Sequence, residues 1–139
     1  MLSNSRTLRI EWSDCDPAGI VFYPRFFSMF DTSTTMLFEK ALSMSGAEIY
    51  RHYNVIGYPI VGVEARFLIP IGYRDEVTIE TSVAEIRRSS FDMRHRLRKA
   101  GALAVETLEK RVWAAKHPDD PARIKSQPLP QEIVAKLSA

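Results

Sequence analysis

Hydrophobic and polar residues alternate with period two in several segments of the chain, and this alternation is typical of half-buried strands. Four such segments span residues 6–12, 61–67, 76–83 and 91–98. A short hairpin turn at Ala100-Gly101 then leads into a returning strand, which we predict over residues 102–115. The alternation shifts phase between Val105 and Leu108, which predicts a β-bulge there.

One long helix is predicted between the first strand and the others. Pro24 suits the first turn of a helix, where its missing N–H is not needed. Apolar residues then recur at helical spacing: Phe26, Phe30, Leu37 and Ala41. The helix is expected over residues 24–44 with Gly46 as its stop, and it is apolar enough to be wrapped by a sheet. A short terminal helix is expected between Pro130 and Leu137.

The order of these elements predicts an α+β fold. One strand, one long helix and four strands in a meander form an antiparallel sheet whose apolar face curls around the helix. Parallel βαβ units are excluded because helices are missing between the later strands. No repeat, low-complexity tract or linker interrupts residues 1–139, so we expect a single domain.

Composition excludes several classes of function. The chain has 19 Lys and Arg against 17 Asp and Glu, and a net charge of +2 does not favour a nucleic-acid partner. No stretch approaches the about 20 apolar residues of a membrane span, and no signal peptide is visible. We therefore expect a soluble, cytoplasmic protein without a membrane partner. The single cysteine, Cys15, excludes an internal disulfide.

Residues 14–24, DCDPAGIVFYP, hold the candidate chemistry. Asp14 and Asp16 lie in a loop directly ahead of the predicted helix, whose N-terminus offers unpaired N–H groups and the positive end of the helix dipole. That end would polarise a carbonyl and stabilise an oxyanion, while a nearby carboxylate attacks the carbonyl or deprotonates a water. The alternative is that one of the aspartates only caps a turn, as Asp-Pro-x-Gly does.

Other chemistry is not indicated. The chain lacks a nucleophile elbow, a dinucleotide fingerprint and a phosphate loop. His52, His95 and His117 are too far apart for a local metal site, and His95 is expected in the core or in an interface. No basic residue flanks Cys15 within its segment, so we expect it to pack rather than react.

The run from Ile10 to Pro24 resembles the active-site segment of 4-hydroxybenzoyl-CoA thioesterases of the Asp-containing hotdog-fold class. The resemblance continues through residues 57–61 and 87–91 and so covers most of the chain. It implies a hotdog fold, in which a sheet of about five strands wraps one helix. It also implies hydrolysis of the coenzyme A thioester of a small aromatic acid. Neither a metal nor an organic cofactor is then required, because coenzyme A is part of the substrate.

The resemblance implies a role for each matching residue. Asp16 matches the catalytic carboxylate, and Tyr23 matches the residue whose backbone N–H binds the thioester oxygen. Asp31 matches a helix carboxylate that meets the hydroxyl of a hydroxybenzoyl ring, and Phe22 and Tyr58 fall in the acyl pocket. The site for the nucleotide end of coenzyme A falls on Arg87, Arg88, Ser89 and Ser90, of which Arg87, Arg88 and Ser90 match the family residues.

Two departures from the family pattern keep other substrates open. Ser89 stands where the family has a further basic residue, and Tyr58 stands where a smaller hydroxyl residue is expected. The alternatives are a thioesterase for aliphatic acyl-CoA or acyl-carrier-protein esters, and a non-catalytic acyl-CoA-binding protein. One helix covers only part of a five-stranded sheet and edge strands need protection, so we expect a homo-oligomer, either a dimer or a dimer of dimers.

Overall fold

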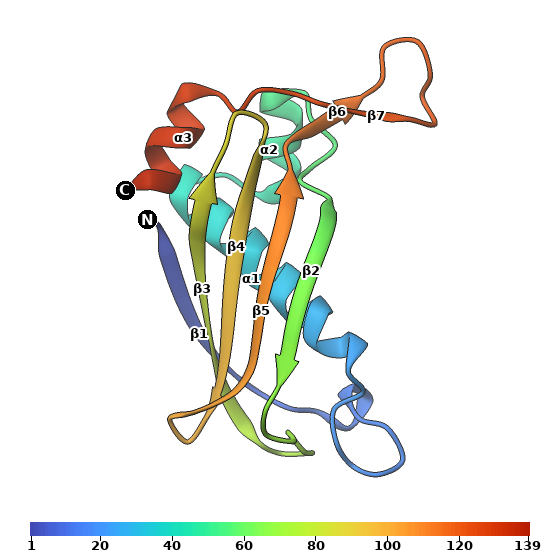
Figure 1. The fold of residues 1–139 in the computed structure, drawn as a ribbon, viewed down its shortest axis with the longest axis vertical. Helices are drawn as coiled ribbons and strands as arrows, with labels where there is room; N and C mark the ends of the chain where they lie inside the picture. The colour runs from blue at the N-terminus through green and yellow to red at the C-terminus, as the bar shows by residue number, and fades with distance from the viewer.

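The computed structural model describes residues 1–139 as a five-stranded antiparallel sheet with a long helix, α1 (Pro24–Leu42), lying across one face (Figure 1). Across the sheet the strands run in the order β1 (Ser3–Arg9), β3 (Glu76–Ile86), β4 (Ser90–Lys99), β5 (Ala102–Val112) and β2 (Ile60–Phe67). The predicted α+β architecture, a sheet around one helix, is confirmed. No helix of the chain is both long and apolar enough to cross a membrane.

Helix α1 begins at Pro24 as predicted and buries one face against the sheet. The buried face carries Phe26, Met29, Phe30, Ser33, Thr34, Leu37 and Phe38. The helix ends at Leu42, because Ser43 adopts the left-handed conformation with φ 53°. The expected stop at Gly46 is therefore wrong. The helix ends early because Ser43, three residues before Gly46, is its C-cap.

Gly46 instead begins a second helix, α2 (Gly46–Tyr53), which the periodicity did not predict. The Oγ of Ser45 accepts the N–H of Glu48 at 3.2 Å and caps this helix. Serine followed three residues later by glutamate is a known start signal for a helix. The helix is only 8 residues long, and it buries Ile49 alone, so its apolar periodicity is weak.

The strand order differs from a simple meander at one strand. β3, β4 and β5 form the predicted meander, but β2 pairs with β5 and not with β3. β1 pairs with β3, so the strands before and after α1 occupy opposite edges of the sheet (Figure 1). The reason is that α1 crosses the sheet and carries the chain from one edge to the other.

Element boundaries account for the remaining corrections. The first strand covers Ser3–Arg9 rather than 6–12, and Trp12–Asp14 forms a short 3-10 turn. The predicted strand 102–115 is divided, because β6 (Ala114–Lys116) leaves the sheet to pair with β7 (Ile124–Ser126) in a projecting hairpin (Figure 1).

The β-bulge in β5 lies at Ala104 rather than between Val105 and Leu108. Leu97 pairs with Val105 while Arg98 pairs with Leu103, so Ala104 is the extra residue. Both Ala104 and Val105 are buried, which is how the strand changes the phase of its alternation.

The core lies between the sheet and α1, with the terminal helix α3 (Gln131–Ser138) closing one end. α3 matches the predicted terminal helix and buries Ile133 and Leu137 in a cluster with Phe38 and Trp113. β2 does not share this core: apart from half-buried Ala65, all of its residues are exposed.

Candidate active site

The loop before α1 folds back on itself and fixes the side chain of Asp16. The backbones of Cys15 and Val21 form an isolated antiparallel β-bridge, and the N–H of Asp16 donates to the carbonyl of Ile20 at 2.9 Å. The carboxylate Oδ1 of Asp16 accepts the N–H of Ala18 at 2.9 Å. The other oxygen makes no hydrogen bond within the chain, and the residue is half-buried. Asp16 therefore caps a turn and still presents a free carboxylate oxygen.

The same loop is anchored to the segment before β3. The N–H of Val21 donates to the carbonyl of Ile71 at 2.8 Å, and the N–H of Tyr73 donates to the carbonyl of Gly19 at 3.0 Å. Gly19 has φ 81°, a conformation that glycine adopts without strain. These contacts hold the loop in one position relative to the sheet.

Tyr23 is the N-cap of α1, and its backbone N–H donates to no other group of the chain. An unpaired N–H at the start of a 19-residue helix is a donor for an oxyanion. Its ring packs edge-on against Phe67, which also contacts Phe26. These three aromatic residues are part of the lining of a mostly apolar cavity of about 390 Å³. Phe22 lies beside Tyr23 and is half exposed.

Asp31 lies two turns further along α1, on its exposed side. Its Oδ1 accepts a hydrogen bond from the Nη2 of Arg111 at 3.0 Å, although the two residues are 80 positions apart in the sequence. The same guanidinium donates through Nη1 to the carbonyl of Tyr58 at 3.2 Å. Asp31, Tyr58 and Arg111 contribute to the lining of a second cavity of about 330 Å³.

The side chain of Tyr58 belongs to the core. Its ring stacks on Phe38 with centroids 4.3 Å apart and lies near Trp113. Burial is the main cause that raises the pKa of the Tyr58 phenol, so the hydroxyl stays protonated. That hydroxyl neither donates nor accepts a hydrogen bond within the chain.

The residues predicted to bind coenzyme A lie at the turn between β3 and β4, with Ser90 as the first residue of β4. Arg87 donates to both oxygens of Asp92, at 2.9 and 2.7 Å, and to Glu85 at 2.8 Å. The Arg87 guanidinium lowers the pKa of Asp92 even though burial opposes this. Arg88 is exposed, and its side chain makes no hydrogen bond or ion pair within the chain. Of the two arginines, Arg88 is the one that is free for a phosphate.

Ser89 and Ser90 shape this turn through their backbones. The N–H of Arg87 donates to the carbonyl of Ser90 at 2.8 Å, and the N–H of Trp113 donates to the carbonyl of Ser89 at 2.9 Å. The turn and the Asp16 loop lie at opposite ends of the sheet (Figure 1). β3, with its 11 residues, connects these two ends and is about 37 Å long. The two predicted halves of the site therefore do not meet within one chain.

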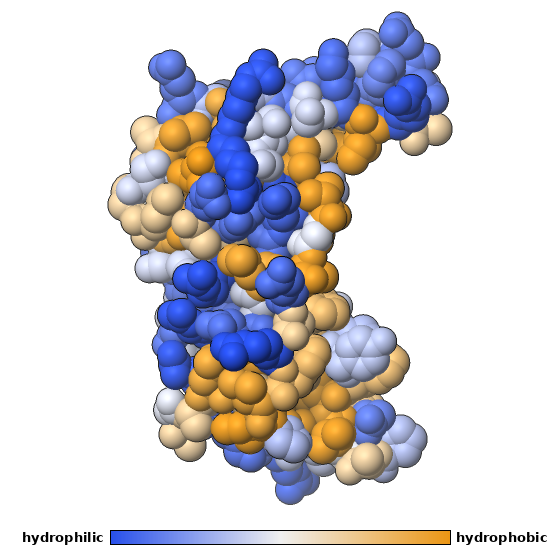
Figure 2. All heavy atoms as spheres, in the orientation of Figure 1, coloured by the Kyte–Doolittle hydropathy of each residue, from blue (hydrophilic) through white to orange (hydrophobic).

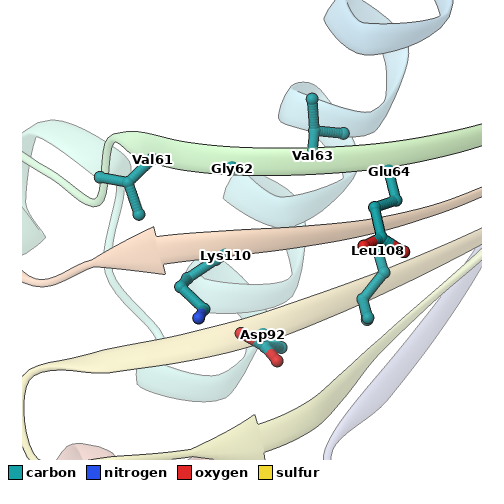
Figure 3. Close-up of a pocket in the computed structure, with 7 residues that line it drawn as sticks. All are labelled: Val61, Gly62, Val63, Glu64, Asp92, Leu108 and Lys110. Carbon is teal, nitrogen blue, oxygen red and sulfur yellow. The ribbon is translucent and has the colours of Figure 1, made fainter.

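A third cavity, of about 440 Å³, opens on the face of the sheet away from α1 (Figure 3). It lies between β2 and β4, and the ammonium of Lys110 points toward the carboxylate of Asp92 there (Figure 3). None of the residues predicted for catalysis or binding lines it.

Two charged residues that the sequence analysis did not single out are fully buried. Glu109 is 0% exposed and Arg111 is 3% exposed. They could have been found, because both fall on the inward phase of β5 together with Val105 and Thr107. Burial opposes ionisation of Glu109, but hydrogen bonding to His95 and the charge of Arg111 keep the pKa of its carboxyl below the usual range.

Cys15 packs as expected. Its Sγ approaches the carbonyl of Glu11 at 3.6 Å, and burial together with the negative charges of Asp14, Asp16 and Asp75 raises the pKa of the thiol. A raised pKa leaves little thiolate at neutral pH, so this residue is a poor nucleophile. No three side chains among histidine, cysteine, aspartate and glutamate gather in an arrangement that could hold a metal ion.

The chain matches the family model of the thioesterase-like superfamily over residues 10–137. It is 32% identical over 135 residues to a 4-hydroxybenzoyl-CoA thioesterase of Pseudomonas sp. strain CBS-3, with 94% of each protein covered. The solved structure of a 4-hydroxybenzoyl-CoA thioesterase from the same strain has a TM-score of 0.88 and 31% identity over 98% of this chain and 99% of that one.

Two further solved structures are similar to this chain. A D-to-N mutant of a 4-hydroxybenzoyl-CoA thioesterase, complexed with 4-hydroxybenzoyl-CoA, has a TM-score of 0.88 and 31% identity, with 99% of each chain covered. A gentisyl-coenzyme A thioesterase has a TM-score of 0.81 and 28% identity over 98% of this chain and 100% of that one. Together with the family match, these likenesses confirm the expected hotdog fold.

Proposed function

Because the chain belongs to the thioesterase-like superfamily, we propose that it hydrolyses the coenzyme A thioester of a small, hydroxylated aromatic acid. The observation that carries this proposal is the loop geometry at α1. One oxygen of Asp16 is held by the N–H of Ala18 and the other is free, while the N–H of Tyr23 stands unpaired at the helix start. A carboxylate and an oxyanion donor are the two groups that acyl transfer from a thioester needs.

In the proposed mechanism, the Tyr23 N–H and the α1 dipole stabilise the oxyanion that forms on the thioester carbonyl. Asp16 either attacks the carbonyl carbon to form a mixed anhydride, which water then hydrolyses, or takes a proton from the water that attacks. In both routes the carbon–sulfur bond breaks and coenzyme A leaves as a thiolate. The products are the free acid and coenzyme A, and no strong general acid is required.

The proposed acyl group follows from the relatives and from Asp31. The similar enzymes are named for 4-hydroxybenzoyl-CoA and gentisyl-coenzyme A, both esters of hydroxylated aromatic acids. The Asp31 carboxylate in this chain lines a cavity and has an oxygen that no group of the chain occupies. A carboxylate oxygen is the acceptor that a phenol hydroxyl requires.

We propose that the working enzyme is a homo-oligomer in the cytoplasm. The exposed edge of β2 supports the oligomer. Ile60, Val61, Val63 and Phe67 on β2 are each at least 40% exposed. The hollowed right-hand side of the molecule in Figure 2 shows this apolar surface below the projecting hairpin. A second copy paired with this edge would cover it, and would bring the Arg88 turn of one chain toward the Asp16 loop of the other.

The test is a panel of esters assayed for release of free coenzyme A thiol: 4-hydroxybenzoyl-CoA, benzoyl-CoA and a medium-chain acyl-CoA. We expect the hydroxylated aromatic ester to be hydrolysed with the highest kcat/KM. Binding of all three esters without thiol release would refute an enzyme and leave an acyl-CoA-binding protein. A preference for the aliphatic ester would refute the proposed acyl group.

A further inference from the structure

A line of buried polar side chains connects the centre of the sheet to Asp31 on α1. Thr81 and His95 are 2.8 Å apart between Oγ1 and Nδ1, and the Nε2 of His95 is 3.2 Å from Oε2 of Glu109. The Nε of Arg111 donates to that same oxygen at 2.9 Å, and its Nη2 reaches Asp31 at 3.0 Å. Only Asp31, at the end of the line, is exposed.

Stability alone does not explain this arrangement. A buried ion pair often contributes no more than well-packed apolar residues of the same volume would, because both charges must be removed from water. The His95 ring stacks on Phe30 with centroids 4.8 Å apart and an interplanar angle of 7°, and the Oγ1 of buried Thr34 lies 3.4 Å from its Nε2. The proposed mechanism uses none of the buried residues of this line. Asp31, at its exposed end, is where they can affect the substrate.

The Arg111 guanidinium fixes two walls of the same cavity. Its Nη2 holds one oxygen of Asp31, and its Nη1 holds the backbone carbonyl of Tyr58. Both residues line the cavity of about 330 Å³. Without this contact, the Asp31 side chain, which is 63% exposed, would be free to change rotamer. With it, Oδ1 is occupied and Oδ2 remains available.

The Arg111 guanidinium is held in turn by the buried carboxylate of Glu109. Glu109 accepts from Arg111, and His95, whose other ring nitrogen contacts Thr81, bonds to the same carboxylate oxygen. Glu109 also offsets the charge of Arg111, which would otherwise be buried beside a single exposed partner. The planar guanidinium of Arg111, fixed by Glu109, loses less conformational freedom on forming a hydrogen bond than a lysine ammonium would in the same place.

We propose that Arg111, held by Glu109, is a positioning residue that aims Asp31 at a ring hydroxyl and so sets a preference for hydroxylated aromatic acyl groups. This inference rests on the proposed function. It adds a determinant of specificity on β5, 80 residues away in sequence from the carboxylate it serves.

The test is Arg111→Lys, which keeps the positive charge and removes the fork. We expect kcat/KM for 4-hydroxybenzoyl-CoA to fall by about tenfold, the order of one charge-assisted hydrogen bond, mainly through KM. The value for benzoyl-CoA should change by less than about twofold, because that ring has no hydroxyl for Asp31 to bind. Arg96→Lys is the matched control: Arg96 pairs with Glu106 through its own Nε at 2.8 Å, outside the line. It should leave the ratio of the two values unchanged.

A double-mutant cycle separates positioning from a general structural effect. In an Asp31→Asn background, Arg111→Lys should cause no further loss of the preference for the hydroxylated ester. Equal losses for both esters, or additive losses in the cycle, would overturn the inference. If Arg111→Lys fails to fold, Glu109→Gln and Asp31→Asn must each lose the preference, and a preference retained in either folded variant also overturns it.

The outcome for the unaltered enzyme distinguishes this inference from the proposed function. Hydrolysis of none of the aromatic esters would refute the proposed function itself. Hydrolysis of 4-hydroxybenzoyl-CoA and benzoyl-CoA at equal kcat/KM would leave an aromatic acyl-CoA thioesterase. It would overturn the preference for a hydroxylated ring and, with it, the role of Arg111 and Asp31.

Discussion

The carboxylate of Asp16 and the backbone N–H of Ala18 are joined by a hydrogen bond of 2.9 Å, within a loop that closes directly ahead of α1. The bond uses Oδ1 and leaves Oδ2 without a partner in the chain. One side chain thereby satisfies two demands that the sequence presented as alternatives, because it both caps a turn and offers an ionisable oxygen.

Asp16→Asn should separate those two demands. The amide oxygen of asparagine can still accept the Ala18 N–H, so the loop and the unfolding midpoint should be preserved. The carboxylate charge is lost, and kcat should fall by about 10² to 10⁴, the range for positioned acid–base groups. Steady-state kinetics with 4-hydroxybenzoyl-CoA measures this. A folded Asp16→Asn enzyme with near-normal kcat would exclude the mechanism.

Tyr23→Pro should remove the proposed oxyanion donor. It also removes the ring that packs on Phe67, which Tyr23→Ala removes while keeping the N–H. Tyr23 has φ −51°, close to the value that proline imposes, and its N–H makes no bond within the chain. We expect a loss in kcat of about 10² to 10³ with a smaller change in KM. Ala47→Pro, in the first turn of α2, is the matched control for introducing proline at a helix start. An equal loss in both variants would contradict a specific role for the Tyr23 N–H.

Arg88→Ala should weaken binding of coenzyme A esters without slowing the chemical step. Its guanidinium is exposed and unpaired, unlike that of Arg87, so its full charge is available to a phosphate. KM should rise by about tenfold with kcat nearly constant. The corresponding acyl-pantetheine lacks the nucleotide, and its KM should not change. Arg94→Ala, a loss of the same charge from the middle of β4, is the control.

Acid should destabilise the protein partly through Asp92. Arg87 holds the pKa of Asp92 below its usual value, so the ionised form stabilises the folded state above the unfolded pKa of about 3.9. That contribution is lost as the pH falls through the folded pKa. Asp92→Asn should therefore show a smaller fall in the urea midpoint between about pH 5 and pH 3 than the unaltered protein does.

Asp119→Asn in the β6–β7 hairpin is the control for removing a carboxylate, because exposed Asp119 makes no ion pair within the chain. Some acid sensitivity should remain in Asp92→Asn, because the pKa values of Asp75, Glu106 and Glu109 are also lowered in the fold. An identical midpoint shift in the Asp92→Asn variant and the unaltered protein would contradict the role of the Arg87–Asp92 pair.

Val63→Lys should disrupt the proposed oligomer. Val63 is 45% exposed on the edge strand β2, so a lysine there costs the isolated chain little but would bury a charge in a paired edge. Light scattering at micromolar protein should show a larger assembly for the unaltered protein and a monomer for the variant. Ser5→Lys, at an exposed position of the opposite edge strand β1, should not change the mass of the assembly. A monomer in all three samples would refute an oligomer.

The sequence by itself determined the elements with strong local patterns. Period-two alternation located β3 and β4, and the apolar stripe after Pro24 located α1, because each pattern follows directly from which side of an element is buried. The Asp16 loop was also predicted, since turn-forming residues ahead of a proline indicate both a turn and the start of a helix. The short helix α2 was missed because 8 residues with one buried side chain carry almost no periodicity.

Only the tertiary structure decided which distant residues meet. Whether β2 joins β3 or β5 is not encoded in the alternation of β2, because alternation does not specify which strand lies alongside. The path of α1 across the sheet decides it. In the same way, Arg111 and Asp31 meet because β5 packs beneath α1, and no local pattern records a contact between residues 80 positions apart. Local patterns report burial, and burial alone does not specify a partner.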